Sequence, residues 1–131
     1  MYVLTAKGEI LTEKSEYLGN YAINAQTSAC PYYKTKPEPP SGAKYLYQST
    51  VSGKWLVGDK KCIMENEADN GIQIESLFSA KYPGSLGLVW GKYKVANSAP
   101  QTDFTMAVTE SLDPSGKFYF YYSCSLSLVK L

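Results

Sequence analysis

One short acidic segment carries side chains that could bind Ca²⁺. Their oxygens recur at alternating positions, a spacing that this ion accepts. The residues are Glu65, Glu67, Asp69 and Asn70. A calcium-binding loop also needs a glycine and a final glutamate at set positions. Here Gly71 comes one position late, and Ser76 stands where the glutamate belongs. The segment is therefore interpreted as a solvated turn between strands, and no metal site is predicted.

The groups that serve the common enzyme classes are missing from the sequence. The chain has no histidine, which excludes Ser-His-Asp and Cys-His nucleophiles and the usual zinc sites. It has no P-loop, no G-x-G-x-x-G pattern and no C-x-x-C pair. Glycoside hydrolysis needs only two carboxylates, yet none of the 12 acidic residues stands in a distinguishing context. We therefore expect no catalytic residues, no cofactor and no enzymatic activity.

Tyrosine is the residue type that points most directly to a function. The chain has 12 Tyr beside 4 Phe and 2 Trp, and an apolar ring with a polar tip suits recognition surfaces as well as half-wet strands. Sugar rings present apolar C–H patches flanked by hydroxyls, which aromatic faces with nearby polar groups match. The predicted ligand-binding residues are Tyr119, Tyr121, Ser123, Tyr45, Tyr47 and Trp55.

These residues favour carbohydrate binding of the lectin type, without catalysis and with a glycan or glycoprotein as partner. Proteins of this type usually gain avidity by presenting several binding sites, which favours a homodimer. One alternative is a protein–protein interaction or structural module whose Tyr-rich face is an oligomer interface. Another is a membrane-acting defence protein whose Tyr-rich loops rest at the lipid interface. Packing also competes with ligand contact, against a second sheet or a dimer partner for Tyr119 and Tyr121 and in the core for Trp55.

Alternation with period two predicts strands along most of the chain. It is longest in the segment 117–131, which places Phe and Leu on one face and Tyr and Ser on the other. The central segment 44–58 predicts a hairpin with a turn at Ser52-Gly53 that sets Thr50 opposite Trp55. The segment 2–13 predicts a second hairpin around Lys7-Gly8, with Leu4 facing Leu11. Pro31 predicts that the short strand 31–35 lies at a sheet edge.

No stretch of about ten residues has a helical apolar period, and turns rich in Gly, Pro and Asn separate the strands. About nine short strands indicate one all-β domain over residues 1–131, an antiparallel β-sandwich or barrel. The net charge of +1, with 13 basic and 12 acidic side chains, gives no global field that attracts nucleic acid or an anionic membrane.

The apolar runs are too short for a membrane span or a signal peptide. We therefore expect a soluble protein, cytoplasmic unless a leader has been removed and the chain is secreted. The three cysteines, Cys30, Cys62 and Cys124, are odd in number and widely spaced, which favours free thiols. A bridge between Cys30 and Cys62 stays open as an alternative.

The middle of the chain groups tyrosine, tryptophan and glycine in short strand-like pieces. The pieces are Pro31-Tyr32-Tyr33-Lys34, Tyr45-Leu46-Tyr47, Gly53-Lys54-Trp55-Leu56-Val57-Gly58, Pro83-Gly84 and Trp90. Together they resemble a short Tyr/Trp/Gly-rich β module of the type Y-L-Y…G-K-W-L-V-G, which recurs in multidomain proteins of invertebrates and protists. The resemblance covers roughly half of the chain. It implies a small β module for extracellular or surface recognition, with no catalytic residues to transfer.

Overall fold

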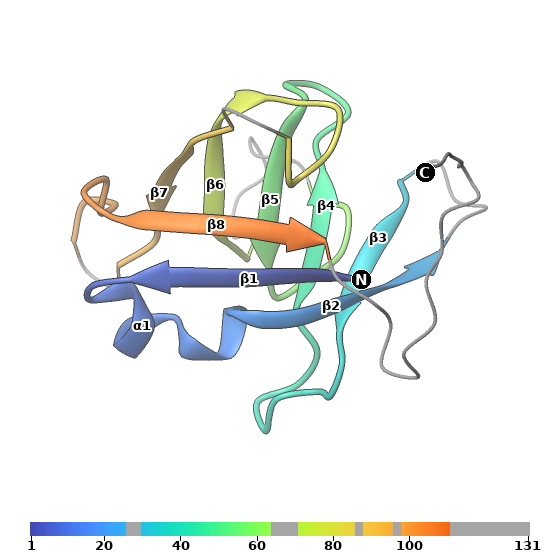
Figure 1. Ribbon diagram of the computed structural model, residues 1–131, viewed down its shortest axis with the longest axis horizontal. Helices are drawn as coiled ribbons and strands as arrows, with labels where there is room; N and C mark the ends of the chain where they lie inside the picture. Colours follow the sequence, from blue (N-terminus) through green and yellow to red (C-terminus); the bar gives the residue numbers. More distant parts are fainter. Residues whose placement is uncertain (26–29, 64–70, 86–87, 96–97, 111–131) are drawn as a thin grey trace, which may run out of the picture.

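The computed structural model describes residues 1–25, 30–63, 71–85, 88–95 and 98–110. Within them the chain is all-β, and eight antiparallel strands form one sheet in the order β7-β6-β5-β4-β3-β2-β1-β8. The sheet curls until its outer strands β7 and β8 approach each other, which gives a nearly closed barrel (Figure 1). The prediction of an antiparallel all-β sandwich or barrel is confirmed, and the barrel is the form observed.

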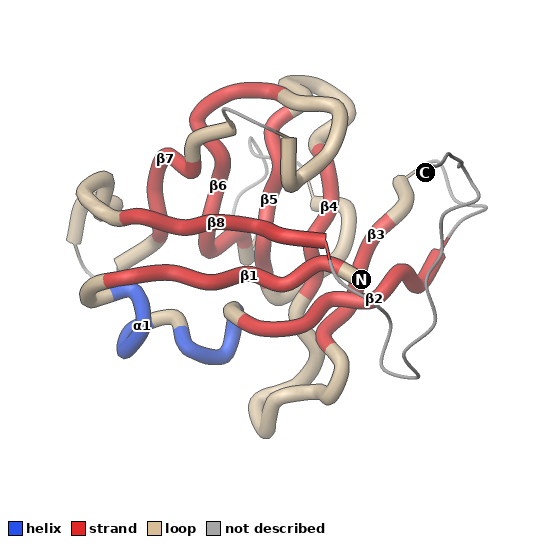
Figure 2. Tube along the Cα trace, in the orientation of Figure 1, coloured by secondary structure: helices blue, strands red, loops and turns tan. Residues whose placement is uncertain are grey.

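The strands follow one another along the chain and are short. They are β1 (Tyr2–Lys7), β2 (Gly19–Ala25), β3 (Tyr32–Thr35), β4 (Tyr45–Gln48), β5 (Lys54–Gly58), β6 (Ile72–Ser79), β7 (Trp90–Tyr93) and β8 (Thr105–Glu110). Two short helical turns, α1 (Ile10–Glu13) and the 3-10 turn η1 (Ser15–Tyr17), connect β1 to β2 and lie below β1 in Figure 2.

The main core fills the inside of the barrel with large apolar side chains from most of the strands. Its buried members are Tyr2, Leu4, Ile10, Tyr21, Leu46, Trp55, Val57, Ile74, Trp90, Tyr93 and Met106. Alternation along β4 and β5 sends the intervening side chains to the outer face of the sheet. There a smaller cluster forms from Tyr32, Tyr47, Leu56 and Ile72. The central hairpin is therefore buried on both of its faces.

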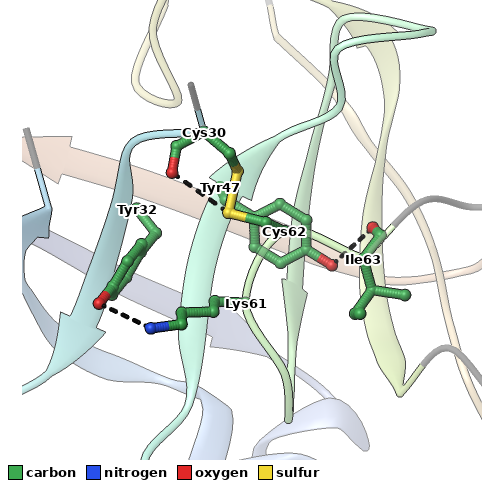
Figure 3. Close-up of a disulfide and its surroundings, with 6 residues drawn as sticks. All are labelled: Cys30, Tyr32, Tyr47, Lys61, Cys62 and Ile63. Atoms are coloured by element: carbon green, nitrogen blue, oxygen red, sulfur yellow. Dashed lines mark hydrogen bonds between the residues drawn. A yellow bond between two sulfur atoms is a disulfide. The ribbon is translucent and has the colours of Figure 1, made fainter. Parts of the chain in front are cut away.

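A disulfide between Cys30 and Cys62 packs on this outer cluster, so the expectation of free thiols is wrong for these two residues. Cys30 directly precedes Pro31 and β3, and Cys62 follows β5, so the bridge spans β4 and lies beside Tyr47 (Figure 3). The Tyr47 hydroxyl donates to the carbonyl oxygen of Ile63 at 3.0 Å. Sequence spacing left the pairing undecided because the strands that bring the two cysteines together are set by sheet order. Cys124 lies outside the described residues.

Both ends of the barrel are covered. At one end α1 inserts Ile10, which has no exposed surface. At the other end the segment 80–85 crosses the mouth, with Pro83 fully buried and Gly84 close to the carbonyl oxygen of Val108. The carbonyl oxygen of Ala80 accepts hydrogen bonds from Gln48 Nε2 at 2.7 Å and from Trp55 Nε1 at 2.9 Å. These two bonds tie the covering segment to the central hairpin.

The predicted hairpin over residues 2–13 does not form. Its first arm is β1, but the second arm begins the one-turn helix α1, so Leu4 is buried while Leu11 is 50% exposed. The reason is that β1 pairs with β2 on one edge and with β8 on the other, which leaves no edge for the segment 9–13.

The central hairpin is confirmed, with a register that differs by two residues from the predicted one. Gln48 lies opposite Trp55, and the turn is longer because Ser49 N–H bonds to the carbonyl oxygen of Lys54 at 2.9 Å. Ser49 Oγ accepts the N–H groups of Val51 and Ser52, each at 3.1 Å, which stabilises the longer turn. A shift of two residues keeps every side chain on its predicted face.

Two further strand predictions concern edges and the C-terminus. The strand β3 is not an edge strand, since it pairs with both β2 and β4. Pro31 stands just before it, so the missing N–H removes no bond from the ladder. The predicted strand in 117–131 and the acidic segment 65–69 lie outside the described residues.

The disulfide predicts a measurable contribution to stability. Replacing Cys30 and Cys62 together by Ser should lower the free energy of unfolding by about 3–4 kcal/mol, because the bridge closes a loop of 32 residues in the unfolded chain. Urea unfolding followed by circular dichroism measures this, with Cys124→Ser as the matched single-thiol control. Equal stability of the double variant and the wild type would contradict the prediction. So would alkylation of Cys30 or Cys62 in unreduced, denatured protein.

Candidate functional site

The structure separates the predicted binding residues that it describes. Tyr47 is fully buried in the outer cluster and Trp55 is buried in the main core, so the two lie on opposite faces of the sheet. Tyr45 remains partly exposed and packs edge-on against the Tyr32 ring, with the ring centroids 5.6 Å apart. Tyr119, Tyr121 and Ser123 lie outside the described residues. Of the predicted binding residues that the structure describes, only Tyr45 has appreciable exposed surface for a ligand.

A polar network lies at the α1 end of the barrel. The Lys44 side chain is 6% exposed, and its Nζ lies 2.9 Å from Asp59 Oδ1 and 4.8 Å from the centre of the Tyr17 ring. The Tyr17 hydroxyl donates to the same carboxylate oxygen at 2.6 Å, and Gln73 Nε2 donates to the other at 3.1 Å. Lys14 Nζ extends the network by donating to Gln73 Oε1 at 2.8 Å. These contacts join α1, η1, β6 and the loops that follow β3 and β5.

The Asp59 carboxylate compensates the buried Lys44 charge in this network. Burial acts to raise the pKa of the Asp59 carboxyl, but the hydrogen bonds from Tyr17 and Lys44, the Lys44 charge and the Gln73 amide together outweigh burial and lower it. Burial raises the pKa of the Tyr17 hydroxyl, and its bond to the Asp59 carboxylate adds to that effect. Burial lowers the pKa of the Lys14 ammonium, with partial opposition from Asp59. Because donors and acceptors here satisfy each other, we assign the network to closing the barrel end.

A wide, shallow hollow opens at the opposite end of the barrel, beside the β4–β5 turn. Its volume is about 560 Å³, and its lining is rich in hydroxyl groups. The lining residues are Gln48, Ser49, Thr50, Val51, Ser52, Gly53, Ser79, Ala80 and Lys81. Gly53 is required at this wall, since its φ is +76° and a Cβ there would come 2.7 Å from Ser79 Cβ. The hollow is thus framed by the longer turn that the sequence did not predict.

Exposed apolar side chains lie on the segments at this end of the barrel, and we call them the apolar rim. They are Val51, Leu77, Phe78, Tyr82 and Val89, with exposures between 49% and 81%. The sequence did not identify these five residues, because strand and turn patterns do not show which apolar side chains stay exposed after folding. One signal could have found them: the segments 45–58 and 76–95 contain no aspartate or glutamate.

A second depression of about 160 Å³ lies over β6 and β7. Its lining includes Glu75 and Lys92, whose charged groups are 3.7 Å apart and neutralise each other. Among the described residues no group of three or more His, Cys, Asp or Glu is placed to hold a metal ion. In the same part of the chain no helix is long and apolar enough to cross a membrane.

Removing the Lys44–Asp59 ion pair should change both the stability of the fold and its dependence on pH. Asp59→Asn leaves a nearly buried ammonium without its counter-charge and should lower the free energy of unfolding by about 1–3 kcal/mol. Because folding lowers the Asp59 pKa, its contribution is present above the ordinary value of 3.8 and is lost as pH falls through the lower folded value. Wild-type stability should therefore fall on acidification below pH about 4 more steeply than that of the variant.

Glu16→Gln is the matched control for this prediction. Glu16 is 44% exposed, and its carboxylate lies 4.0 Å from Lys44 Nζ, so its loss should change stability by less than about 1 kcal/mol. Chemical unfolding of the three proteins between pH 3 and pH 7 makes the comparison. Equal losses in the two variants would show that Lys44 has no preferred partner.

Comparison with known proteins assigns no family to this chain. No protein-family model, no curated protein and no solved structure matches it. What the hollow and the apolar rim can bind therefore follows from their own chemistry.

Proposed function

We propose that this protein is a carbohydrate-binding recognition protein without catalysis, whose ligand occupies the hollow beside the β4–β5 turn. The observation that carries the proposal is an open, hydroxyl-lined surface next to exposed aromatic side chains. Its volume of about 560 Å³ is within the range of small-molecule sites, roughly 300–1,000 Å³.

The lining matches the chemistry of a sugar ring. Thr50, Ser52 and Ser79 are exposed hydroxyl residues, and a hydroxyl can both donate and accept hydrogen bonds, as sugar hydroxyls require. Tyr82 is 54% exposed and directly follows the lining residue Lys81, and we assign its ring to the C–H side of the sugar. A shallow site of this kind suits the exposed end of a glycan chain better than an enclosed metabolite.

The disulfide supports a role outside the reducing cytosol. Disulfides persist in oxidising compartments, where glycans of cell surfaces and secreted proteins are displayed. The Cys30–Cys62 bridge stabilises the outer face of the hairpin whose turn frames the hollow. Recognition of extracellular glycans is consistent with both the disulfide and the hydroxyl-lined hollow.

A glycan array on the purified chain tests this function. We expect a related set of glycans to bind, equally with and without a chelator of divalent cations. Tyr82→Ala should weaken binding about tenfold, since one aromatic contact is worth up to about 1.5 kcal/mol. An array on which no glycan binds would contradict the proposed function.

Two controls locate the site. Tyr45→Ala removes a partly exposed tyrosine on the outer face of β4 and should leave glycan affinity unchanged. Replacing Tyr119 and Tyr121 together by Ala tests the surface predicted from the sequence. If either control abolishes binding while Tyr82→Ala does not, the ligand lies away from the hollow. Circular dichroism of each variant excludes unfolding as the cause.

A further inference from the structure

Exposed apolar side chains are concentrated at one end of the barrel. Of the seven large hydrophobic side chains that stay exposed in the described part of the chain, five form the apolar rim. The other two, Leu11 and Ile23, lie on α1 and β2. Val51 at the tip of the β4–β5 turn is 81% exposed, and Phe78 at the end of β6 is 57% exposed. Exposed apolar groups that gather at one place mark a surface for a partner or a membrane more often than scattered ones do.

Backbone pairing brings the segments that carry the rim side by side. Ser79 pairs with Lys54, so the end of β6 lies next to the β4–β5 turn that carries Val51. Leu77 N–H bonds to the carbonyl oxygen of Val89 at 2.7 Å, which places these two residues on neighbouring segments. The segment 80–85 extends from the same end of β6, at the top of the barrel in Figure 1. The rim therefore rests on rigid, hydrogen-bonded backbone.

The two segments that carry the rim contain basic residues and no acidic ones. Residues 45–58 and 76–95 contain no acidic side chain, although the whole chain has 12 acidic residues and a net charge of only +1. Lys54 stands at the start of β5 beside the turn, and Lys81 is exposed, with its ammonium 5.5 Å from the centre of the Tyr82 ring. One acidic residue, Glu110, lies on the Tyr82 side of the rim, since Glu110 and Tyr82 both interact electrostatically with Tyr2 and Tyr33. The Val51 and Phe78 side of the rim is thus apolar and cationic.

We propose that the apolar rim docks on an anionic lipid surface. Val51 and Phe78 enter the boundary between head groups and acyl chains, and Tyr82 takes the interfacial position that suits an amphipathic ring. Lys54 and Lys81 meet the lipid phosphates, where each cation near a negative leaflet adds to the attraction. Exposed apolar side chains beside lysines, on two segments that contain no acidic residue, fit a deformable lipid surface.

This proposal does not depend on the carbohydrate hypothesis. Vesicles of phosphatidylcholine and phosphatidylserine carry no sugar, so binding to them is measured apart from any glycan. The hollow and the apolar rim face the same end of the barrel, so a protein docked in this way would hold its hollow toward the membrane surface. Failure on vesicles with success on the glycan array would remove the docking proposal alone.

Sedimentation of the full chain with vesicles tests the docking. We expect binding to vesicles that contain phosphatidylserine and little binding to pure phosphatidylcholine. Val51→Ser with Phe78→Ser should weaken binding at least about tenfold, because two exposed apolar groups no longer enter the interface. Lys54→Gln and Lys81→Gln should each weaken it about fivefold, the effect of one cation near the surface. Raising the salt concentration should also weaken the binding of the wild-type protein to these vesicles.

Leu11→Ser is the matched control. Leu11 is 50% exposed, nearly as much as Phe78, but lies between Glu9 and Glu13, so an anionic surface should not attract it. The control should bind vesicles as the wild type does. The proposal is overturned if the wild type ignores phosphatidylserine or if Leu11→Ser weakens binding as much as the rim variants. It is also overturned if the wild type self-associates in light scattering and the rim variants do not, because the rim is then an interface between copies of the chain.

Discussion

The burial of the central hairpin on both faces is the constraint on which the rest of the structure depends. Leu46, Trp55 and Val57 point into the barrel, while Tyr47 and Leu56 point outward and are also buried. A hairpin with two apolar faces needs a cover on each side. The curled sheet supplies the inner cover. The disulfide and its neighbours supply the outer one, where Lys61 also lies 4.8 Å from the centre of the Tyr32 ring (Figure 3).

The same hairpin positions the surface that we assign to binding. An indole N–H buried in a core needs an acceptor, and for Trp55 this is the carbonyl oxygen of Ala80. That bond, with the one from Gln48, holds the segment 80–85 across the barrel mouth. The core of the hairpin thereby determines where Lys81 and Tyr82 lie. The core hairpin and the proposed binding surface are therefore linked through one acceptor, the carbonyl oxygen of Ala80.

The two ends of the barrel differ in chemistry. At the α1 end, Lys44 and Asp59 satisfy each other inside a hydrogen-bonded network, so little polar capacity is directed outward. At the other end the hollow and the apolar rim are open, and backbone bonds rather than ion pairs hold them in place. Both ends of the barrel are covered, and we propose that a partner binds at the second of them. This asymmetry supports both proposals, since each places the partner at the open end.

Local patterns predicted much of the strand content, because alternation, glycine and proline act over a few residues. The central hairpin, β1 and β3 follow this rule. Sheet order does not, since it depends on which edges remain unpaired after the chain collapses. For this reason the predicted arm 9–13 became α1, and β3 became an internal strand despite Pro31. Two of the predicted binding residues, Tyr47 and Trp55, are buried for a related reason: tyrosine and tryptophan also pack well in a core, and exposure is a property of the folded chain.

The sequence by itself determined that this is an all-β domain without histidine chemistry, since composition and period-two alternation are local facts. Tertiary structure alone decided that Cys30 and Cys62 meet, that Tyr47 and Trp55 are buried on opposite faces, and which apolar side chains stay exposed. The physical reason is that each of these outcomes depends on strands distant in sequence coming together. The free energy of that assembly comes from burying the whole core at once, which no short stretch of residues encodes.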